Sequence, residues 1–365
     1  MEKLFSNAFK NKTIFLTGHT GFIGSWLSLW LTNLGGNVIG YSLKPPSKPS
    51  MFEILGIQDK ITHIHGDINN QKILEKKIFE HKPNFLFHIA AQSLVKESYK
   101  NTKNTFQTNV MGTVNVLEAI KNLKFIKNVI VMTSDKSYDN IEKRKFYKED
   151  DPLGGSDPYS ASKGASEIII NSYRKSFFQK NKISLSTVRA GNVIGGGDWA
   201  KDRIIPDCIR ALKSKKPIHV RNPNAVRPFQ FVLEPISALL WISANMNKDP
   251  TSYSTSWNVG PTKKCGKTEI KVLVPKIIKQ WGDGTWVSKV DKIHGESKIL
   301  MLDSTKIKNK LKWSPIFSIN EAIAHTINWY KAYYKKSENI QELSVKQIEN
   351  YVKKAKELNM EWSKY

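Results

Sequence analysis

Apolar residues in the first half of the chain form short runs separated by longer segments in which they recur every three or four positions. Short continuous apolar runs are typical of strands buried on both faces of a parallel sheet, and the longer segments have the spacing of covering helices. Strands are predicted at residues 13–16, 38–42, 61–65, 85–89, 129–132 and 185–188, and helices at 21–34, 71–81, 102–123 and 159–178. This alternation predicts an α/β fold with a Rossmann-type, doubly wound parallel sheet.

A glycine-rich turn lies between the first predicted strand and its helix, with the spacing Gly-x-x-Gly-x-x-Gly. Its residues are Gly18, Thr20, Gly21, Phe22, Ile23 and Gly24. Glycine lets the backbone approach a pyrophosphate, and a helix N-terminus supplies free N–H groups and the positive end of its dipole. Since the turn follows a strand and precedes a helix, we interpret it as a dinucleotide-binding turn.

Further predicted strands end in residues that suit the same nucleotide crevice. These residues are Asp67, Ile68, Ala90, Ala91 and Gln92. Small side chains at such positions leave room for a cofactor. The second strand, however, ends in Leu43-Lys44 without a carboxylate for the ribose 2′-hydroxyl, so this position leaves the choice between NAD and NADP open.

Residues 133–163 carry a set of acid, base and hydride-transfer groups. Ser134, Asp135 and Lys136 directly follow the predicted strand 129–132, at the sheet edge where open α/β sheets bind ligands. Tyr159 and Lys163 share one face of a helix that begins near Pro158, and a cation beside a phenol lowers the pKa of the phenol. Such a Tyr takes a hydroxyl proton while a nicotinamide takes the hydride. Asp135 and Lys136 add an acid for a leaving hydroxyl and a base for a carbon-bound proton, which indicates elimination of water.

Composition limits the class of protein. The 365 residues suffice for one large domain or two joined ones. The formal charge of +25 fits a nucleic-acid or membrane partner, but the basic residues are scattered and no such motif is visible, so we expect neither partner. With only Cys208 and Cys265, no signal peptide and no apolar run near the roughly 18 residues of a membrane span, we expect a cytoplasmic protein; no metal site is predicted.

The seven arginines stand out against the excess of Lys and all lie between Arg144 and Arg227. A retained Arg suggests a need for a planar, bidentate donor. We expect internal salt bridges for Arg174 and Arg210, and contact with a substrate pyrophosphate for Arg227.

The second half of the chain is irregular and rich in Gly and Pro, which predicts a smaller C-terminal substrate-binding cap over the sheet edge. We divide the chain into a nucleotide-binding Rossmann domain at residues 1–188, to which 228–250 returns, a substrate-binding domain at 189–227 and 251–335, and a C-terminal helical tail at 336–365. The return contains a strand at 229–232 and a helix at 235–245.

The glycine turn, the Tyr159-x-x-x-Lys163 pair and the two-part layout resemble the extended short-chain dehydrogenase/reductases that act on nucleotide sugars. Within that group, the strings TSDKSYDN, DPLGGSDPYSASKGASE, VRAGNVIGGGDWA and RPFQFVLEP resemble the CDP-glucose 4,6-dehydratases, and the likeness covers nearly the whole chain. Ser134-Asp135-Lys136 is the most diagnostic part, since related dTDP- and GDP-sugar dehydratases have Glu where this chain has Lys136.

The resemblance implies NAD as cofactor, CDP-glucose as substrate, a homodimer or homotetramer, and a place in deoxysugar biosynthesis for bacterial O-antigen. It implies that Tyr159, helped by Lys163, removes the proton of the sugar 4-hydroxyl, to which Ser134 is hydrogen-bonded. Lys136 then removes the C5 proton, and Asp135 protonates the departing C6 hydroxyl. Substrate contacts are implied at Asn192, Arg203, Arg227 and Glu296.

Two other functions fit parts of this pattern. One is a different nucleotide-sugar 4,6-dehydratase or a 4-epimerase, which differs in whether water is lost and from which sugar. The other is a non-catalytic nucleotide-binding protein, against which the complete acid–base set argues.

Overall fold

The computed structural model describes residues 1–143, 145–262, 267–288 and 299–364. Its centre is a seven-stranded parallel sheet with the strand order β12-β7-β5-β4-β1-β2-β3. The strands are β1 (Thr13–Thr17), β2 (Asn37–Ser42), β3 (Thr62–His65), β4 (Phe85–His88), β5 (Asn128–Met132), β7 (Ser184–Ala190) and β12 (Ser256–Val259). The predicted doubly wound parallel sheet is confirmed, and the strand order reverses between β1 and β4, where such sheets bind ligands.

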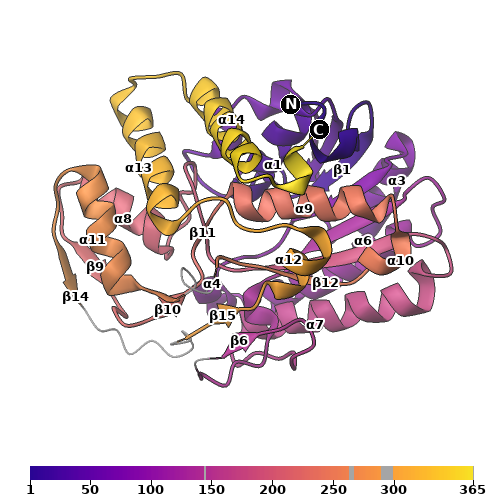
Figure 1. Ribbon diagram of the computed structural model, residues 1–365. Helices are drawn as coiled ribbons and strands as arrows, with labels where there is room; N and C mark the ends of the chain where they lie inside the picture. The colour runs from indigo at the N-terminus through magenta and orange to yellow at the C-terminus, as the bar shows by residue number, and fades with distance from the viewer. Residues whose placement is uncertain (144, 263–266, 289–298, 365) are drawn as a thin grey trace.

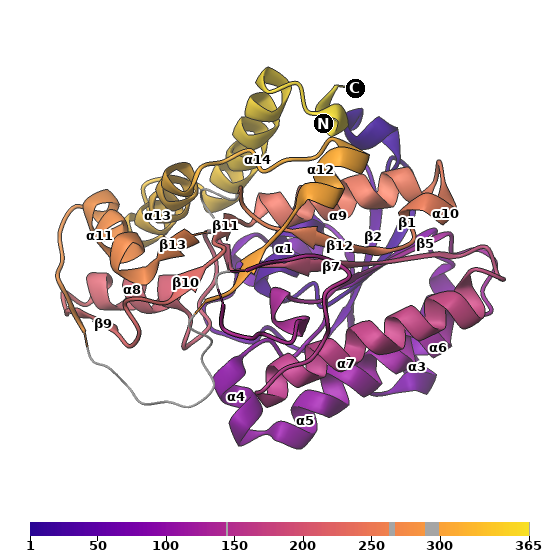
Figure 2. The same cartoon turned by 60° about the horizontal axis from the view of Figure 1, so that its bottom comes forward.

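Successive side chains of each strand point to opposite sides, so an apolar strand gives the sheet two apolar faces. Helices cover both of these faces. In β1, Ile14 and Leu16 belong to one apolar core, while Phe15 belongs to the other. The first core includes α1 (Phe22–Asn33), α9 (Leu233–Met246), α13 (Ile319–Lys335) and α14 (Ile340–Glu357), and the second includes α3 (Gln71–His81), α6 (Gly112–Ile120) and α7 (Pro158–Tyr173). Figure 2 shows the sheet between α9 on one side and the layer of α3, α6 and α7 on the other.

Short strand pairs and two helices build the part of the chain outside this sandwich. The pairs are β8 (Val193–Ile194) with β11 (Gln230–Phe231), β9 (Ile218–Val220) with β14 (Trp286–Ser288), β10 (Val226–Arg227) with β13 (Thr268–Glu269), and β6 (Phe146–Tyr147) with β15 (Met301–Leu302). The helices are α8 (Ile204–Lys213) and α11 (Ile270–Trp281). In Figure 1, α8, α11, β9 and β14 lie together at the left, away from the main sheet.

One placement in the predicted cap was wrong: residues 256–259, expected there, form β12 and pair with β7 at the edge of the main sheet. Residues 229–232 were predicted to return to the Rossmann domain together with the helix at 235–245. β11 in this segment pairs with β8, and the following α9 covers the main sheet. Neither segment has a periodic apolar pattern that fixes its partner, so contacts distant in sequence decide the pairing.

The predicted helix 102–123 is interrupted rather than uniform. It consists of α5 (Thr102–Phe106), a π-helical turn (Gln107–Met111) and α6, and a second π turn (Arg174–Phe178) continues α7. The remaining short helices are α2 (Met51–Ile54), α4 (Val95–Lys100), α10 (Pro250–Tyr253) and α12 (Thr305–Leu311).

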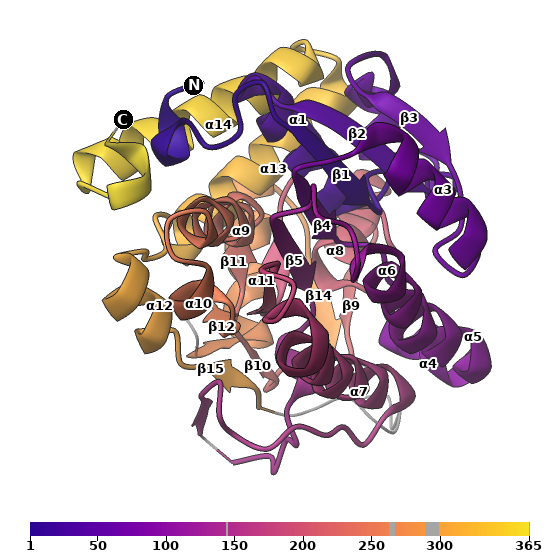
Figure 3. The ribbon, with the colours of Figure 1, turned by 90° about the vertical axis from the view of Figure 1, so that its right-hand side faces the viewer.

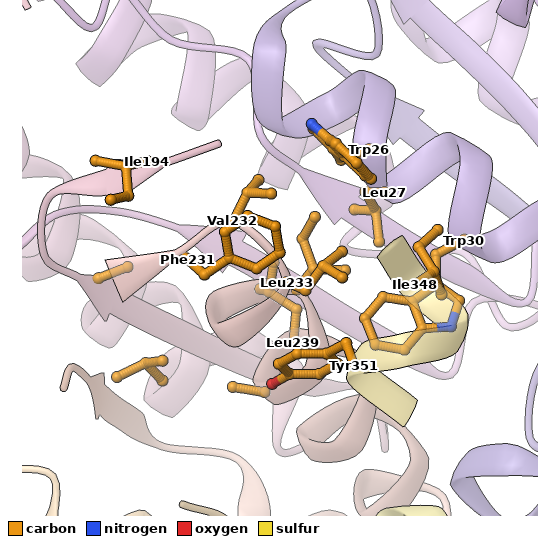
Figure 4. Packing of buried hydrophobic residues seen from close by; sticks show 14 of the residues in the cluster. Trp26, Leu27, Trp30, Ile194, Phe231, Val232, Leu233, Leu239, Ile348 and Tyr351 are labelled. Carbon is orange, nitrogen blue, oxygen red and sulfur yellow. The ribbon is translucent and has the colours of Figure 1, made fainter. Parts of the chain in front are cut away.

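The C-terminal segment forms α14 and packs on the body of the molecule. Ile348 and Tyr351 of α14 meet Trp26 and Trp30 of α1 and side chains of α9 in one apolar cluster (Figure 4). The two chain ends lie side by side (Figures 1 and 3), where the ring of Trp362 stacks on Phe5 with centroids 5.0 Å apart. The C-terminal segment therefore packs against α1, the helix that follows the glycine turn, and against the N-terminal residues.

Candidate active site

The glycine turn after β1 packs closely against the turn after β4. Gly18 has a φ of +81°, and a Cβ there would lie 2.6 Å from the amide nitrogen of Ala90. A Cβ on Gly24 would lie 2.1 Å from the carbonyl oxygen of Gly18, whereas at Gly21 the nearest atom is 3.4 Å away. Gly18 and Gly24 are therefore required by close packing, and the turn presents the start of α1 with free N–H groups, as a pyrophosphate needs.

Two residues predicted to bind the cofactor, Thr20 and Gln92, make hydrogen bonds within the protein. The hydroxyl of the buried Thr20 lies 2.8 Å from Ser42 Oγ and donates to the carbonyl of Leu43 at 2.9 Å, so it ties the glycine turn to the end of β2. The side-chain amide of Gln92 donates to Thr105 Oγ1 at 2.9 Å and holds the segment after β4 against α5.

Asp67, Ile68 and Ala90 lie at the predicted strand ends but do not line the main cavity. One carboxylate oxygen of Asp67 accepts from the amide of Asn69 at 2.9 Å, in a separate polar hollow at the end of β3. Ile68 is buried in the core beside α6.

The predicted catalytic residues surround a single cavity of about 330 Å³ at the C-terminal edge of the sheet. Of the residues predicted for cofactor, substrate and chemistry, those that line it are Phe22, Ile23, Ala91, Ser134, Asp135, Lys136, Tyr159, Lys163, Asn192, Arg203 and Arg227. Segments far apart in the sequence, from the start of α1 to β10, thus contribute to one site. Glu296 lies outside the residues that the structure describes.

Local capping interactions hold the two catalytic segments. Ser134 follows β5, and its Oγ accepts from the amide of Lys136 at 3.2 Å and donates to Asp135 Oδ1 at 3.1 Å. Asp157 caps α7 by accepting from Ser160 N at 2.9 Å, so α7 begins at Pro158, as predicted. The turn and the helix therefore present their polar groups to the cavity from fixed backbones.

Burial dominates the acid–base properties of this site. It raises the pKa of Asp135 to about 6, against the opposing effects of Lys136, Ser134 and Arg227. The other carboxylate oxygen, Oδ2, is buried without a hydrogen-bond partner among the described residues. Asp135 is therefore a carboxyl group that holds a proton closer to neutral pH than an exposed Asp does.

The lowered pKa predicted for Tyr159 is not found. Burial raises it to about 12, although a hydrogen bond with Ser134 and the charge of Arg203 act in the opposite direction. The ammonium of Lys163 lies 6.0 Å from the centroid of the Tyr159 ring, and burial lowers the pKa of Lys163 itself to about 8. The rise in the pKa of Tyr159 was not predicted, because the sequence spacing shows that the two residues share a helix face but not that both are buried away from solvent.

The arginines divide into two groups. Arg227 and Arg203 line the cavity, as predicted for substrate contacts. The predicted ion pair of Arg210 is confirmed with Asp207, but Arg174 donates to the carbonyl of Leu185 at 2.7 Å rather than to a carboxylate.

Several residues at the cavity were missed by sequence reasoning. Arg203 donates to Asp198 at 3.0 Å and to Ser93 Oγ at 2.7 Å, and both partners line the cavity. Lys96 forms an ion pair with Asp202 at 2.8 Å at the same rim. Asp198 lies within the string VRAGNVIGGGDWA and Ser93 directly follows the predicted Gln92, and these positions are the signal that would have identified them.

Comparison with known proteins places this site in a family. The family model for GDP-mannose 4,6 dehydratase matches residues 15–326, most of the chain. The chain belongs to this GDP-mannose 4,6-dehydratase family. A curated relative, CDP-glucose 4,6-dehydratase of Salmonella typhimurium, is 42% identical over 352 residues, which cover 95% of this chain and 98% of that protein.

Solved structures share the fold of this family member at lower identity. The dTDP-glucose 4,6-dehydratase from Bacillus anthracis in complex with NAD has a TM-score of 0.74 at 22% identity and covers 89% of this chain and 98% of its own. The UDP-glucose 4-epimerase from Thermotoga maritima with UDP-glucose has a TM-score of 0.76 at 22% identity, covering 89% and 99%. The dehydratase fold is thus shared with epimerases, and α14 lies beyond the matched family region.

Within the part of this family member that the structure describes, no helix has the length and apolar character to cross a membrane. The same residues contain no group of three or more side chains suited to hold a metal ion.

Proposed function

We propose that this chain is an NAD-dependent CDP-glucose 4,6-dehydratase, a hydro-lyase that converts CDP-D-glucose to CDP-4-keto-6-deoxy-D-glucose and water. The observation that carries the proposal is the gathering of Ser134, Asp135, Lys136, Tyr159 and Lys163 around one cavity. The family relationship supports the reaction class, and the 42% identical relative supports cytidine as the nucleotide.

The cofactor fits the turn after β1. Gly18 and Gly24 leave a backbone surface that any side chain would fill, and the start of α1 supplies N–H donors for a pyrophosphate. Phe22, Ile23 and Ala91 extend this surface into the catalytic cavity. When bound, the nicotinamide accepts a hydride from C4 of the sugar and later returns it to C6.

The first half of the chemistry falls to Tyr159, Lys163 and Ser134. Tyr159 takes the proton of the 4-hydroxyl while Ser134 holds the same oxygen by a hydrogen bond. Lys163 lies on the same face of α7, and its positive charge favours the phenolate form of Tyr159 in the reacting complex. A ketone at C4 results, and it acidifies the proton on C5.

The elimination falls to Lys136 and Asp135. Lys136 removes the C5 proton, and Asp135 gives its proton to the C6 hydroxyl, which leaves as water. The raised pKa of Asp135 suits this acid role, because a larger fraction of the group holds a proton near neutral pH. C5 is later reprotonated. Tyr159 gains the proton of the 4-hydroxyl and Asp135 loses one to the C6 hydroxyl, so the number of protons on the enzyme is unchanged.

Substrate contacts are assigned to the cationic end of the cavity. Arg227 and Arg203 supply planar donors for the two phosphates, and Asn192, which lines the same cavity, supplies an amide. The role implied for Glu296 stays a prediction.

We infer a cytoplasmic homo-oligomer formed through the helices of the Rossmann half. Met111 and Ile168, on the adjacent helical segments after α5 and in α7, are 45% and 58% exposed. Large apolar side chains exposed on neighbouring helices are typical of a face that another subunit covers. Light scattering on a size-exclusion column should give at least a dimer for the native chain and a monomer for Ile168→Lys.

The proposal is tested by incubating the purified protein with NAD and, separately, CDP-, dTDP-, GDP- and UDP-glucose, and following each sugar nucleotide by mass spectrometry. Loss of 18 Da, fastest from CDP-glucose, is expected since dehydration removes one water. Dehydration fastest from another nucleotide would overturn the cytidine assignment. Isomerisation without mass loss would indicate a 4-epimerase, and no change in any of them a non-catalytic nucleotide-binding protein.

A further inference from the structure

A buried carboxylate, Glu167, lies one helical turn beyond Lys163 on α7 and is only 1% exposed. Its Oε1 accepts from Thr133 Oγ1 at 2.5 Å. Its Oε2 accepts from Thr187 Oγ1 at 2.9 Å and from the guanidinium of Arg189 at 2.8 Å. One side chain thus joins the catalytic helix to residue 133, directly before the Ser134 turn, and to β7.

The contacts continue from Arg189 to the segment before α7 and to β12. Arg189 also donates to Tyr138 Oη and to the carbonyl of Glu149, both at 2.9 Å. Tyr138 donates to Asn258 Oδ1 on β12 at 2.6 Å. The network therefore connects α7, the end of β5, two sheet strands and the segment that precedes α7.

Glu167 faces more positive than negative charge. Lys163 on α7, Arg174 in the π turn and Arg189 on β7 are all buried cations within its electrostatic reach. Burial raises the pKa of Glu167, but Arg189 and the hydrogen bonds outweigh this effect and hold it below its ordinary value. The carboxylate is therefore ionised at neutral pH.

The group that Glu167 affects most directly is Lys163. Burial lowers the pKa of Lys163 to about 8, and the charge of Glu167 opposes that fall. On the other sides of Lys163 lie Tyr159 on its own helix and His88 on β4. Burial first, and Lys163 second, lower the pKa of His88 to about 3, so this ring is neutral and supplies no compensating charge.

We propose that Glu167 is a positioning residue for the dehydratase, which sets the Ser134–Asp135–Lys136 turn against Tyr159 and keeps Lys163 protonated in the working enzyme. This inference rests on the proposed function, because it assigns Glu167 a part in that reaction. Neither the acid–base steps nor the substrate contacts involve Glu167 directly. Two separable effects follow, one geometric through Thr133 and one electrostatic through Lys163.

Two variants separate these effects. Glu167→Gln keeps an acceptor oxygen for Thr133 but removes the charge. The pH above which kcat declines should therefore move to lower pH, because removing the negative charge of Glu167 lowers the pKa of Lys163. Thr133→Val keeps the charge and removes the hydrogen bond, so kcat should fall about tenfold with KM for the sugar nucleotide and the alkaline limb unchanged. Glu80→Gln is the control, because it makes the same exchange at the surface of α3, where Glu80 pairs with Lys77. Its pH profile of kcat should match that of the native protein.

The readouts distinguish this proposal from a purely structural role. Lower thermal stability with a superimposable pH profile in Glu167→Gln would overturn the electrostatic part, and a native kcat in Thr133→Val would overturn the geometric part. If Glu167→Gln does not fold, Thr133→Val still tests the positioning.

The titration of Lys163 can be measured without turnover, by competitive acetylation with peptide mass spectrometry across the pH range. A native Lys163 pKa near 8 that falls in Glu167→Gln supports the electrostatic role even if CDP-glucose is not the substrate. An unchanged Lys163 pKa contradicts it. Failure of the native protein to dehydrate any sugar nucleotide would instead contradict the proposed function, so the two failures are distinguishable.

Discussion

Replacing Asp135 by Asn should make the protein more stable at alkaline pH while abolishing dehydration. Asp135 is 4% exposed, and burial raises its pKa from an ordinary 3.8 to about 6. The ionised carboxylate therefore has a higher free energy in the folded protein than in the unfolded chain. Asn has nearly the same shape and carries no charge, so it removes this penalty.

The size of the effect follows from the shift in pKa. One pKa unit corresponds to about 1.4 kcal/mol, so the shift amounts to about 3 kcal/mol in the free energy of unfolding. Below pH 3.8 the carboxyl group is protonated in both states and the penalty is absent. It grows as the pH rises toward 6 and is complete above it, because the folded state holds the proton over a range in which the unfolded chain has lost it.

The assay is urea unfolding of the native chain and of Asp135→Asn at pH 8 and pH 5, followed by tryptophan fluorescence. The variant should gain about 3 kcal/mol at pH 8 and about half of that at pH 5. A variant that is destabilised equally at both pH values would contradict this expectation, since Asp135 would then be favourably held as an anion. The same preparation should show no water loss from CDP-glucose, because the acid for the C6 hydroxyl is gone.

Three further substitutions test separate parts of the site. Tyr159→Phe removes the base for the 4-hydroxyl, so hydride transfer should fall by a factor of at least about 100, and stopped-flow absorbance should detect no transient NADH. Lys136→Met should still oxidise C4 but accumulate NADH without loss of water; normal dehydration would show that another group is the base. Gly24→Ala places a Cβ 2.1 Å from the Gly18 carbonyl, so calorimetry should give at least tenfold weaker NAD binding, together with a lower Tm; native affinity would contradict the close packing of the turn.

The central sheet and the catalytic segments could be predicted because their signals are local. Buried strands such as β5 read as continuous apolar runs, and residues that follow such a strand lie at one edge of the sheet. Ser134, Asp135 and Lys136 were placed in this way. Tyr159 and Lys163 were placed by helical spacing after Pro158, which begins α7.

The rest depends on contacts between residues far apart in the sequence. β11 is a two-residue strand and β12 a four-residue one, and their sequences do not indicate that β12 joins the main sheet while β11 pairs with β8. The polar network of Glu167 was missed because its partners are 20 to 89 residues away in the sequence, and a buried Glu cannot be told from a surface Glu by sequence alone. The pKa of Tyr159 was predicted in the wrong direction because burial of a helix face is a property of the assembled fold.

The proposed reaction requires an internal transfer of hydride from C4 to C6, with loss of water between the two steps. CDP-glucose carrying deuterium at C4 should be incubated with the protein and NAD, and the product examined by NMR and mass spectrometry. The product should have lost one water and should carry the deuterium in its C6 methyl group. Deuterium that stays at C4 without loss of water, or that is lost to solvent, would contradict the internal transfer of hydride.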